Sequence, residues 1–188
     1  MPLAIYRQGL ILIYKQSRGS LMTLTFKEPN EQQRWYAVDD GVMGGQSHSQ
    51  FSVVGGEGRF HGEVSLENGG GFASVRREPD DFEPALASAK GISLTVRGDG
   101  RTYQLRLKST SLGDASAYRV KFTPSIDTWE TLHFPWEAFE AVRRGTLLTD
   151  VPPIEPANIT QVGFLIADRT AGPFCLQVAS IDALPQHQ

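Results

Sequence analysis

The sequence predicts an all-β protein built as a sandwich or a barrel. Hydrophobic and polar residues alternate with a period of two along many short stretches, which is typical of strands with one face in a core. In residues 102–108, for example, Tyr103, Leu105 and Leu107 alternate with polar side chains. Clusters rich in glycine separate these stretches and favour the tight turns of antiparallel sheets. Two short segments have a helical pattern, so helices add little to the predicted fold.

The alternating stretches follow one another along most of the chain. The expected strands are residues 49–54, 59–66, 92–96, 102–108, 118–122, 131–134, 162–167 and 174–181. Glycine-rich turns are expected at residues 55–58, 67–71 and 97–100. The last of these turns spells Arg-Gly-Asp, which we interpret as a tight hairpin turn and not as an adhesion motif.

Two helices and one rigid loop complete the expected elements. The first helix is predicted over residues 83–90. The second is predicted over residues 135–145, because Pro135 suits a first helical turn and Gly145 suits a C-terminal cap. The proline-rich residues 149–156 are expected to form a rigid surface loop.

Size and composition favour one domain and argue against nucleic acid as a partner. The chain has 188 residues, 40% of them hydrophobic, which is enough for a single core over residues 22–188. Eighteen Lys and Arg against 21 Asp and Glu give a formal charge of −3, so no broad basic face is expected. The single cysteine, Cys175, excludes an internal disulfide and is expected to be a half-buried strand residue.

Residues 1–21 are expected to be an N-terminal extension that the domain does not need. Residues 1–27 carry four basic side chains and no acidic one, a composition that also fits a transit peptide. The apolar run at residues 9–14 is too short to cross a bilayer, so we expect no transmembrane segment there. We favour a functional start at Met22 and a bacterial cytoplasm; a transit peptide would instead place the protein in a mitochondrion.

Motifs of familiar catalytic chemistry are incomplete. Gly45, Gln46 and Ser47 begin like a nucleophile elbow, but Ser49 stands where the closing glycine belongs and no helix follows. The glycines at positions 56, 58 and 62 lack the spacing of a dinucleotide fingerprint, and the four histidines include no pair at metal-ligand spacing. We therefore expect a protein without catalytic residues, cofactor or catalytic metal.

Aromatic side chains on strands have two interpretations, core packing and stacking against sugar rings. Tyr103 and Tyr118 share a strand face with apolar neighbours, so the core is favoured for both. Trp129 falls on the opposite face from Leu132 and Phe134. It is the better candidate for an exposed ring that contacts a ligand.

Several motifs, taken in order, resemble the complex I intermediate-associated protein 30 family. They are Trp35, the string DDGVMGGQS at residues 39–47, Phe60, Gly62 and the string SLENGGGFASVR at residues 65–76. Later pieces agree: residues 96–103, Trp129, residues 134–139, Arg144 with Gly145, and residues 151–153, 159–168 and 176–184. Asp39 and Gly69 stand where asparagine is commoner in that pattern. The resemblance covers about residues 26–184.

The resemblance implies a jelly-roll β-sandwich of the galactose-binding-domain-like type, related in architecture to carbohydrate-binding modules. Mitochondrial members act as assembly factors that bind intermediates of respiratory complex I. A module that binds a protein, such as respiratory complex I subunits or a related membrane complex, is therefore our first expectation. A glycan-binding module is the alternative. An enzyme that uses Asp39, Asp40, Glu67 and Arg76 comes third, because no positioned nucleophile, metal set or cofactor motif supports it.

The candidate binding site centres on two glycine-rich loops. The residues expected there are Asp39, Asp40, Met43, Gly44, Gly45, Ser47, Asn68, Phe72, Arg76 and Trp129. We expect the two aspartates to fasten a chain reversal, and Gly41, Gly44 and Gly45 to permit positive φ. The bare backbone of residues 69–71 allows a partner to approach closely.

Met43 and the paired carboxylates each leave an alternative open. A flexible, polarizable methionine suits an irregular gap in the core as well as an adaptable surface that binds a partner. Asp39, Asp40 and Asp182 offer the hard oxygen atoms that a structural calcium ion prefers, although we favour the fastening role for the first two.

Overall fold

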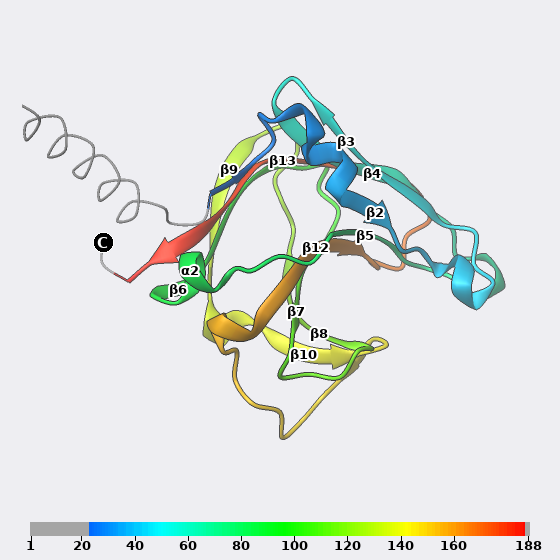
Figure 1. The fold of residues 1–188 in the computed structure, drawn as a ribbon. Coiled ribbons are helices and arrows are strands. Elements are labelled where there is room, and N and C mark those ends of the chain that lie inside the picture. The colour runs from blue at the N-terminus through cyan, green and yellow to red at the C-terminus, as the bar shows by residue number, and fades with distance from the viewer. Residues whose placement is uncertain (1–22, 187–188) are drawn as a thin grey trace, which may run out of the picture.

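The computed structural model describes residues 23–186, which form a sandwich of two antiparallel β-sheets (Figure 1). Sheet A has the strand order β3-β4-β13-β6-β9, with β1 paired to β13, and sheet B has the order β11-β10-β8-β7-β12-β5-β2. Sheet A contains β1 (Thr23–Thr25), β3 (His48–Val54), β4 (Glu57–Val64), β6 (Ala89–Arg97), β9 (Trp129–Pro135) and β13 (Gly172–Pro185). Sheet B contains β2 (Trp35–Ala37), β5 (Ala73–Arg77), β7 (Tyr103–Ser109), β8 (Ser116–Phe122), β10 (Glu140–Arg143), β11 (Thr146–Leu147) and β12 (Ile159–Ile166).

Helical structure in the described residues is confined to single turns and one short helix. The 3₁₀ turns are η1 (Pro29–Arg34), η2 (Asp40–Met43), η3 (Glu67–Gly69), η4 (Trp136–Ala138) and η5 (Pro156–Asn158). The helix predicted over residues 83–90 is confirmed in its first half by α2 (Glu83–Leu86), but its end is wrong, because Ala89 and Lys90 already belong to β6, which pairs with β13. The proline-rich residues 149–155 form a loop as predicted.

The core fills the space between the two sheets and follows the predicted alternation. Tyr103 and Leu105 on β7 are fully buried, and Tyr118 on β8 is buried as expected. Trp35 of sheet B stacks on Phe51 of sheet A, with 4.0 Å between the ring centroids. Large aromatic side chains of this kind contribute much of the buried area that holds two sheets together.

The helix predicted over residues 135–145 is wrong. After the single turn η4, the chain extends into β10, which pairs with β8, and turns back through β11. Pairing with β8 buries Ala141 and Val142 and supplies hydrogen bonds to the β10 backbone. This tertiary gain outweighs the local helical pattern, because a short helix without an apolar contact is only marginally stable.

The hairpin predicted at Arg-Gly-Asp is also wrong, whereas the hairpin at residues 55–58 is confirmed. Gly55 and Gly56 have positive φ and join β3 to β4 in sheet A. β6 and β7, by contrast, belong to different sheets, so residues 98–102 cross from one layer of the sandwich to the other. Asp99 accepts hydrogen bonds there from the Tyr103 hydroxyl and the Cys175 backbone N–H, each at 2.9 Å.

The predicted extension, residues 1–21, lies outside the described residues. Among residues 23–186, we find no helix with the length and apolar character needed to span a bilayer.

Candidate functional site

Two loops at one end of the sandwich lie side by side and hold most of the predicted site residues (Figure 1). We call residues 39–49 and 65–74 together the loop pair. The first segment leads from β2 into β3, and the second leads from β4 into β5. The loop pair therefore links the edges of sheets A and B.

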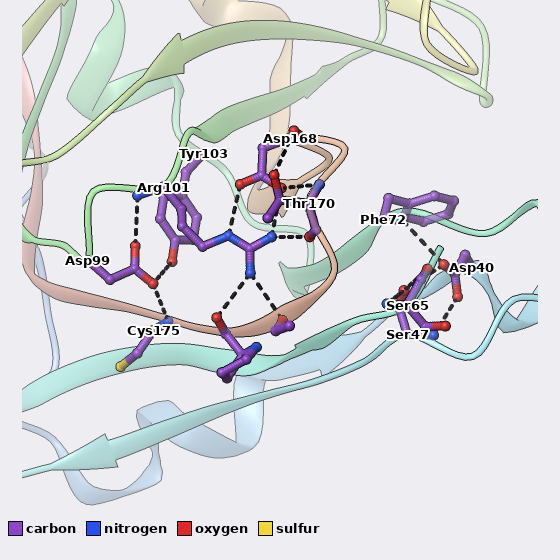
Figure 2. Close-up of polar contacts among 12 residues, drawn as sticks. Asp40, Ser47, Ser65, Phe72, Asp99, Arg101, Tyr103, Asp168, Thr170 and Cys175 are labelled. Atoms are coloured by element: carbon purple, nitrogen blue, oxygen red, sulfur yellow. Dashed lines mark hydrogen bonds and ion pairs between the residues drawn. The ribbon is translucent and has the colours of Figure 1, made fainter. Parts of the chain in front are cut away.

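Asp40 is the centre of the loop pair (Figure 2). Its carboxylate is fully buried and accepts hydrogen bonds from the backbone N–H groups of Ser47 (3.0 Å), Gly71 (2.7 Å) and Phe72 (3.2 Å). The Ser47 hydroxyl donates to the same carboxylate at 2.7 Å and accepts from the Ser65 N–H at 2.9 Å. One side chain thus ties together two loops that are far apart in sequence.

Asp39 fastens the neighbouring turn in the same way. Its carboxylate accepts hydrogen bonds from the Ser49 backbone N–H at 3.0 Å, the Ser49 hydroxyl at 2.6 Å and the Ser74 backbone N–H at 3.0 Å. The Ser74 hydroxyl donates to the Val38 carbonyl. The geometry supports the predicted fastening role of both aspartates.

The electrostatics of Asp40 favour an ionised carboxylate. Burial by itself raises the pKa of Asp40. Hydrogen bonds from Gly71, Ser47 and Phe72 lower the pKa by more than burial raises it, so it lies below its ordinary value. The donors turn their positive ends toward the carboxylate oxygens, which disfavours a cation at the same place. Within residues 23–186, no group of three or more His, Cys, Asp or Glu side chains is placed to hold a metal ion. The geometry therefore gives no support to calcium at Asp39, Asp40 and Asp182.

The glycines of the loop pair are needed for two different reasons. Gly44 has φ +83°, as predicted, and ends the turn η2. The prediction of positive φ at Gly41 and Gly45 is wrong. Gly45 is needed for close approach, because a β-carbon there would overlap the Asp40 carboxylate. A β-carbon at Gly70 would lie 2.6 Å from the same carboxylate.

Apolar side chains project from the loop pair into solvent. Met43 is 65% exposed, so it does not fill a gap in the core. Leu66 is 47% exposed and was missed by sequence reasoning, because it ends the alternating stretch at residues 59–66 and was assigned to that strand. Asn68 takes the left-handed conformation with φ 55°, and Phe72 is partly buried. The loop pair therefore presents apolar groups on a backbone that is held in place.

The structure does not bring Trp129 and Arg76 to the loop pair. Trp129 is 38% exposed at the start of β9, the edge strand of sheet A opposite to β3. Arg76 lies on β5 and points away from the core of sheet B, on the side that also carries Arg106 and Arg119. Sequence reasoning missed the last two residues because their alternation with apolar residues is that of ordinary solvent-facing side chains.

A second polar cluster fastens the crossover segment near the start of β13 (Figure 2). Arg101 forms two hydrogen bonds with the Asp168 carboxylate, at 2.8 and 2.7 Å, and donates to the carbonyl groups of Gly172 and Pro173 at 3.0 Å. The hydrogen bond to Asp168 raises the pKa of Arg101, so the ion pair is stable over the whole physiological range. Cys175 lies on β13 as predicted, but it is exposed rather than half-buried, because it faces away from the core.

The contacts of the described residues do not form a serine triad in the loop pair. The Ser47 hydroxyl is engaged by Asp40 and Ser65, and no histidine accepts its proton in the described contacts. Nucleophilic catalysis by serine needs an adjacent base that is itself held by a third group. The arrangement is suited to holding two loops rigid and to presenting what projects from them.

Comparison with known sequences gives one family. The model of the family described as Complex I intermediate-associated protein 30 (CIA30) matches residues 24–178. Two curated relatives have the name Complex I intermediate-associated protein 30, mitochondrial. The Neurospora crassa relative is 25% identical over 141 residues, which cover 67% of this chain and 51% of the relative. The Mus musculus relative is 24% identical over 173 residues, which cover 81% and 52%. The chain spans about half the length of both.

Comparison with solved structures gives the fold. A family 11 carbohydrate-binding module from Clostridium thermocellum, solved in complex with a β-1,3-1,4-mixed-linked tetrasaccharide, has a TM-score of 0.62 at 15% identity, over 90% of this chain and 100% of the module. An agarase has a TM-score of 0.57 at 8% identity, over 88% of this chain and 25% of the enzyme. At such identities the likeness shows the fold alone, and it confirms the predicted jelly-roll β-sandwich of the galactose-binding-like type.

Proposed function

The chain belongs to the Complex I intermediate-associated protein 30 (CIA30) family, and from this membership we propose that it is a non-catalytic module that binds a protein partner during assembly of a respiratory complex or a related membrane complex. The two curated relatives are mitochondrial by name. For this chain, the proposed location is a mitochondrion if residues 1–21 are a transit peptide, and a bacterial cytoplasm otherwise.

The observation that carries the proposal is the exposed Met43 on the fastened loop pair. The Asp40 hydrogen bonds hold the loop backbone in place, so little conformational entropy is lost when a partner contacts it. A flexible, polarizable thioether adapts to an irregular partner surface. Leu66, also exposed, adds apolar area on the adjacent loop.

A quantitative pull-down tests this contact. The full chain, carrying a tag, is mixed with solubilised membranes from its source cell, and captured respiratory-chain subunits are measured by mass spectrometry. Met43→Ala is expected to keep the melting temperature of the wild type and to lose about 1–2 kcal/mol of binding free energy, roughly 5- to 30-fold in affinity.

Ile126→Ala is the matched control, because Ile126 is 66% exposed and lies outside the loop pair. It should capture the same subunits as the wild type. Unchanged capture by both Met43→Ala and Leu66→Ala would show that the loop pair is not the contact surface.

Binding of a glycan is the second candidate, favoured by the exposed indole of Trp129 on the outer face of sheet A. Aromatic faces stack on sugar rings, and Trp129 pairs in register with Arg97, a donor for hydroxyl groups. Binding of β-glucan oligosaccharides, measured by calorimetry and abolished in Trp129→Ala, would favour this candidate over the first. Capture of membrane subunits that does not depend on Trp129 would favour the first.

A further inference from the structure

A single register row of polar residues crosses six strands on the outer face of sheet B. Strand pairing places these residues opposite one another in the order Tyr36 (β2), Arg76 (β5), Gly163 (β12), Arg106 (β7), Arg119 (β8) and Glu140 (β10). We call these six residues the arginine row. At a strand spacing of about 4.8 Å, the row is about 24 Å long.

Gly163 supplies no side chain in the middle of the arginine row, and its backbone is buried. Its neighbours Val162 and Phe164 are buried in the core, so a side chain at position 163 would project onto the outer face. A β-carbon placed there would lie 2.6 Å from the Val75 carbonyl oxygen and 3.4 Å from Cγ of Arg76. Arg76 and Arg106 therefore lie on either side of a position that carries no side chain.

Side chains on the outer face of sheet B cover one another at this row. Gln104, Arg119 and Gln161 point away from the core, yet all three are buried, with Arg119 only 9% exposed. Side chains on a flat, solvated sheet face would be far more exposed. The charged groups of this face are therefore partly removed from water by their own neighbours.

Positive charge on the arginine row is poorly compensated. Among the contacts of the described residues, the carboxylate of Glu140 is the one acidic partner, and Arg119 donates to it at 3.1 Å. Arg106 donates to the Gln104 side-chain carbonyl at 3.2 Å. Burial, with further contributions from Arg119 and Arg76, lowers the pKa of Arg106 to about 10. Burial, Arg76 and Arg106 likewise lower the pKa of Lys108 on the same face.

Crowded, partly buried cations are unfavourable until an anion joins them. A guanidinium binds a carboxylate through two parallel hydrogen bonds, and such charge-assisted pairs are among the strong ones in proteins. The cluster is local, since the whole chain has a formal charge of −3. This suits a short acidic segment better than the long phosphate backbone of a nucleic acid.

We propose that the arginine row binds an acidic segment of a partner protein, with side-chain carboxylates of the segment seated on Arg76 and Arg106 across Gly163. The inference rests on the proposed function only in taking the partner to be a protein. An acidic peptide fits better than an acidic glycan, because the amides that would hold sugar hydroxyls are engaged. Both N–H groups of Gln161 are donated, to Tyr36 and to the Arg77 carbonyl, and the Gln104 carbonyl accepts from Arg106.

Fluorescence anisotropy with a labelled peptide of alternating glutamate and serine tests the proposal. The wild-type chain is expected to bind at low salt and to lose affinity as salt is added. Arg106→Gln and Arg76→Gln should each weaken binding by about tenfold or more, and Arg106→Lys should fall between wild type and Arg106→Gln. A peptide with glutamine in place of glutamate should not bind.

Arg143→Gln is the matched control, because it removes the same charge from an exposed arginine of sheet B. Arg143 lies three residues after Glu140 on β10 and so points to the opposite side of the strand. Its affinity should stay within about twofold of wild type. If Arg106→Gln does not fold, Arg76→Gln decides the question.

Three outcomes would overturn the proposal: no binding of the acidic peptide by wild type, equal weakening by Arg143→Gln and Arg106→Gln, or tighter binding of an acidic oligosaccharide such as oligogalacturonate. The peptide test is independent of the membrane pull-down. Peptide binding without capture of respiratory subunits would defeat the proposed function alone, and capture that depends on Met43 without peptide binding would defeat this inference alone.

Discussion

The loop pair and the arginine row both hold charged side chains away from bulk water, but they compensate the charge differently. The Asp40 carboxylate receives three backbone N–H groups and one hydroxyl, all from the chain itself. On the arginine row, only the guanidinium of Arg119 contacts a carboxylate, that of Glu140. The charge of the first region is compensated by the chain itself, whereas in the second Arg76 and Arg106 have no acidic partner among the contacts of the described residues.

Arg77, also on sheet B, is an arginine whose charge is compensated by carboxylates. Arg77 is buried beside Glu31, with Nε 2.6 Å from the carboxylate, and also contacts Asp80 at 3.1 Å. Arg76, its neighbour in sequence, points to the other face, where such partners are scarce. The contrast teaches that compensation of charge, and not burial alone, separates structural charges from those available for binding.

Within the loop pair, removing the Asp40 carboxylate should give the largest effect on stability. Asp40→Ala leaves buried N–H donors of Ser47, Gly71 and Phe72 without an acceptor, so we expect a loss of about 3–5 kcal/mol in the free energy of unfolding. Chemical denaturation measures this loss. The exposed Asp114, changed to alanine, should shift stability by less than about 0.5 kcal/mol. Similar values for both variants would refute the structural role of Asp40.

Filling the space beside Asp40 should give a smaller loss. Gly45→Ala places a β-carbon against the carboxylate, and the resulting shift should cost about 1–3 kcal/mol. Gly41→Ala is the control, because Gly41 has open space around it and no positive φ. Thermal melts of both variants compare a crowded position, Gly45, with an open one, Gly41. Equal melting temperatures would contradict our explanation for Gly45.

Acid should remove part of the contribution of Asp40. Its pKa is lower in the folded state than the unfolded value of about 3.9, so its contribution is fully present above about pH 5. That stability is lost as the pH falls through 4 toward the folded pKa. Denaturation between pH 7 and pH 3 should therefore show a shallower loss in Asp40→Asn than in wild type. A loss of the same size in both would show that other carboxylates, such as Asp168, carry the effect.

The smallest effect on stability is expected on the arginine row. Arg106→Gln relieves repulsion from Arg76 and Arg119, so the free energy of unfolding should stay within about 0.5 kcal/mol of wild type or rise slightly. Arg77→Gln leaves the buried Glu31 carboxylate without its cation, so it should lower the free energy of unfolding by about 3–5 kcal/mol. A comparable loss in Arg106→Gln would mean that the row is structural, and the contrast between the two regions would disappear.

Local sequence patterns predicted the strands well. The alternation around Tyr103 and Tyr118 identified core faces, because a strand buried on one side must repeat its apolar residues with a period of two. The glycines at 55 and 56 predicted a hairpin through their freedom to take positive φ. The aspartate pair in the loop predicted a fastened chain reversal, since short carboxylates accept nearby backbone N–H groups.

Local patterns failed where the outcome depended on distant strands. Residues 135–145 have a helical pattern, but β8 was available to pair with β10, and that pairing decided the structure. Gly98 and Asp99 have the pattern of a hairpin turn, and no local pattern indicates that β6 and β7 belong to different sheets. The exposure of Met43 likewise depended on the path of its loop.

The sequence by itself determined the all-β class, the apolar face of most strands and the glycine-rich loops, because these follow from period and from backbone freedom at single residues. Only the tertiary structure decided which loops meet at Asp40 and which side chains share the arginine row. Tyr36 and Glu140 belong to the same row although about a hundred residues separate them. Strand order sets such neighbours, and strand order is fixed by the packing of the whole core, which no local segment of the sequence specifies.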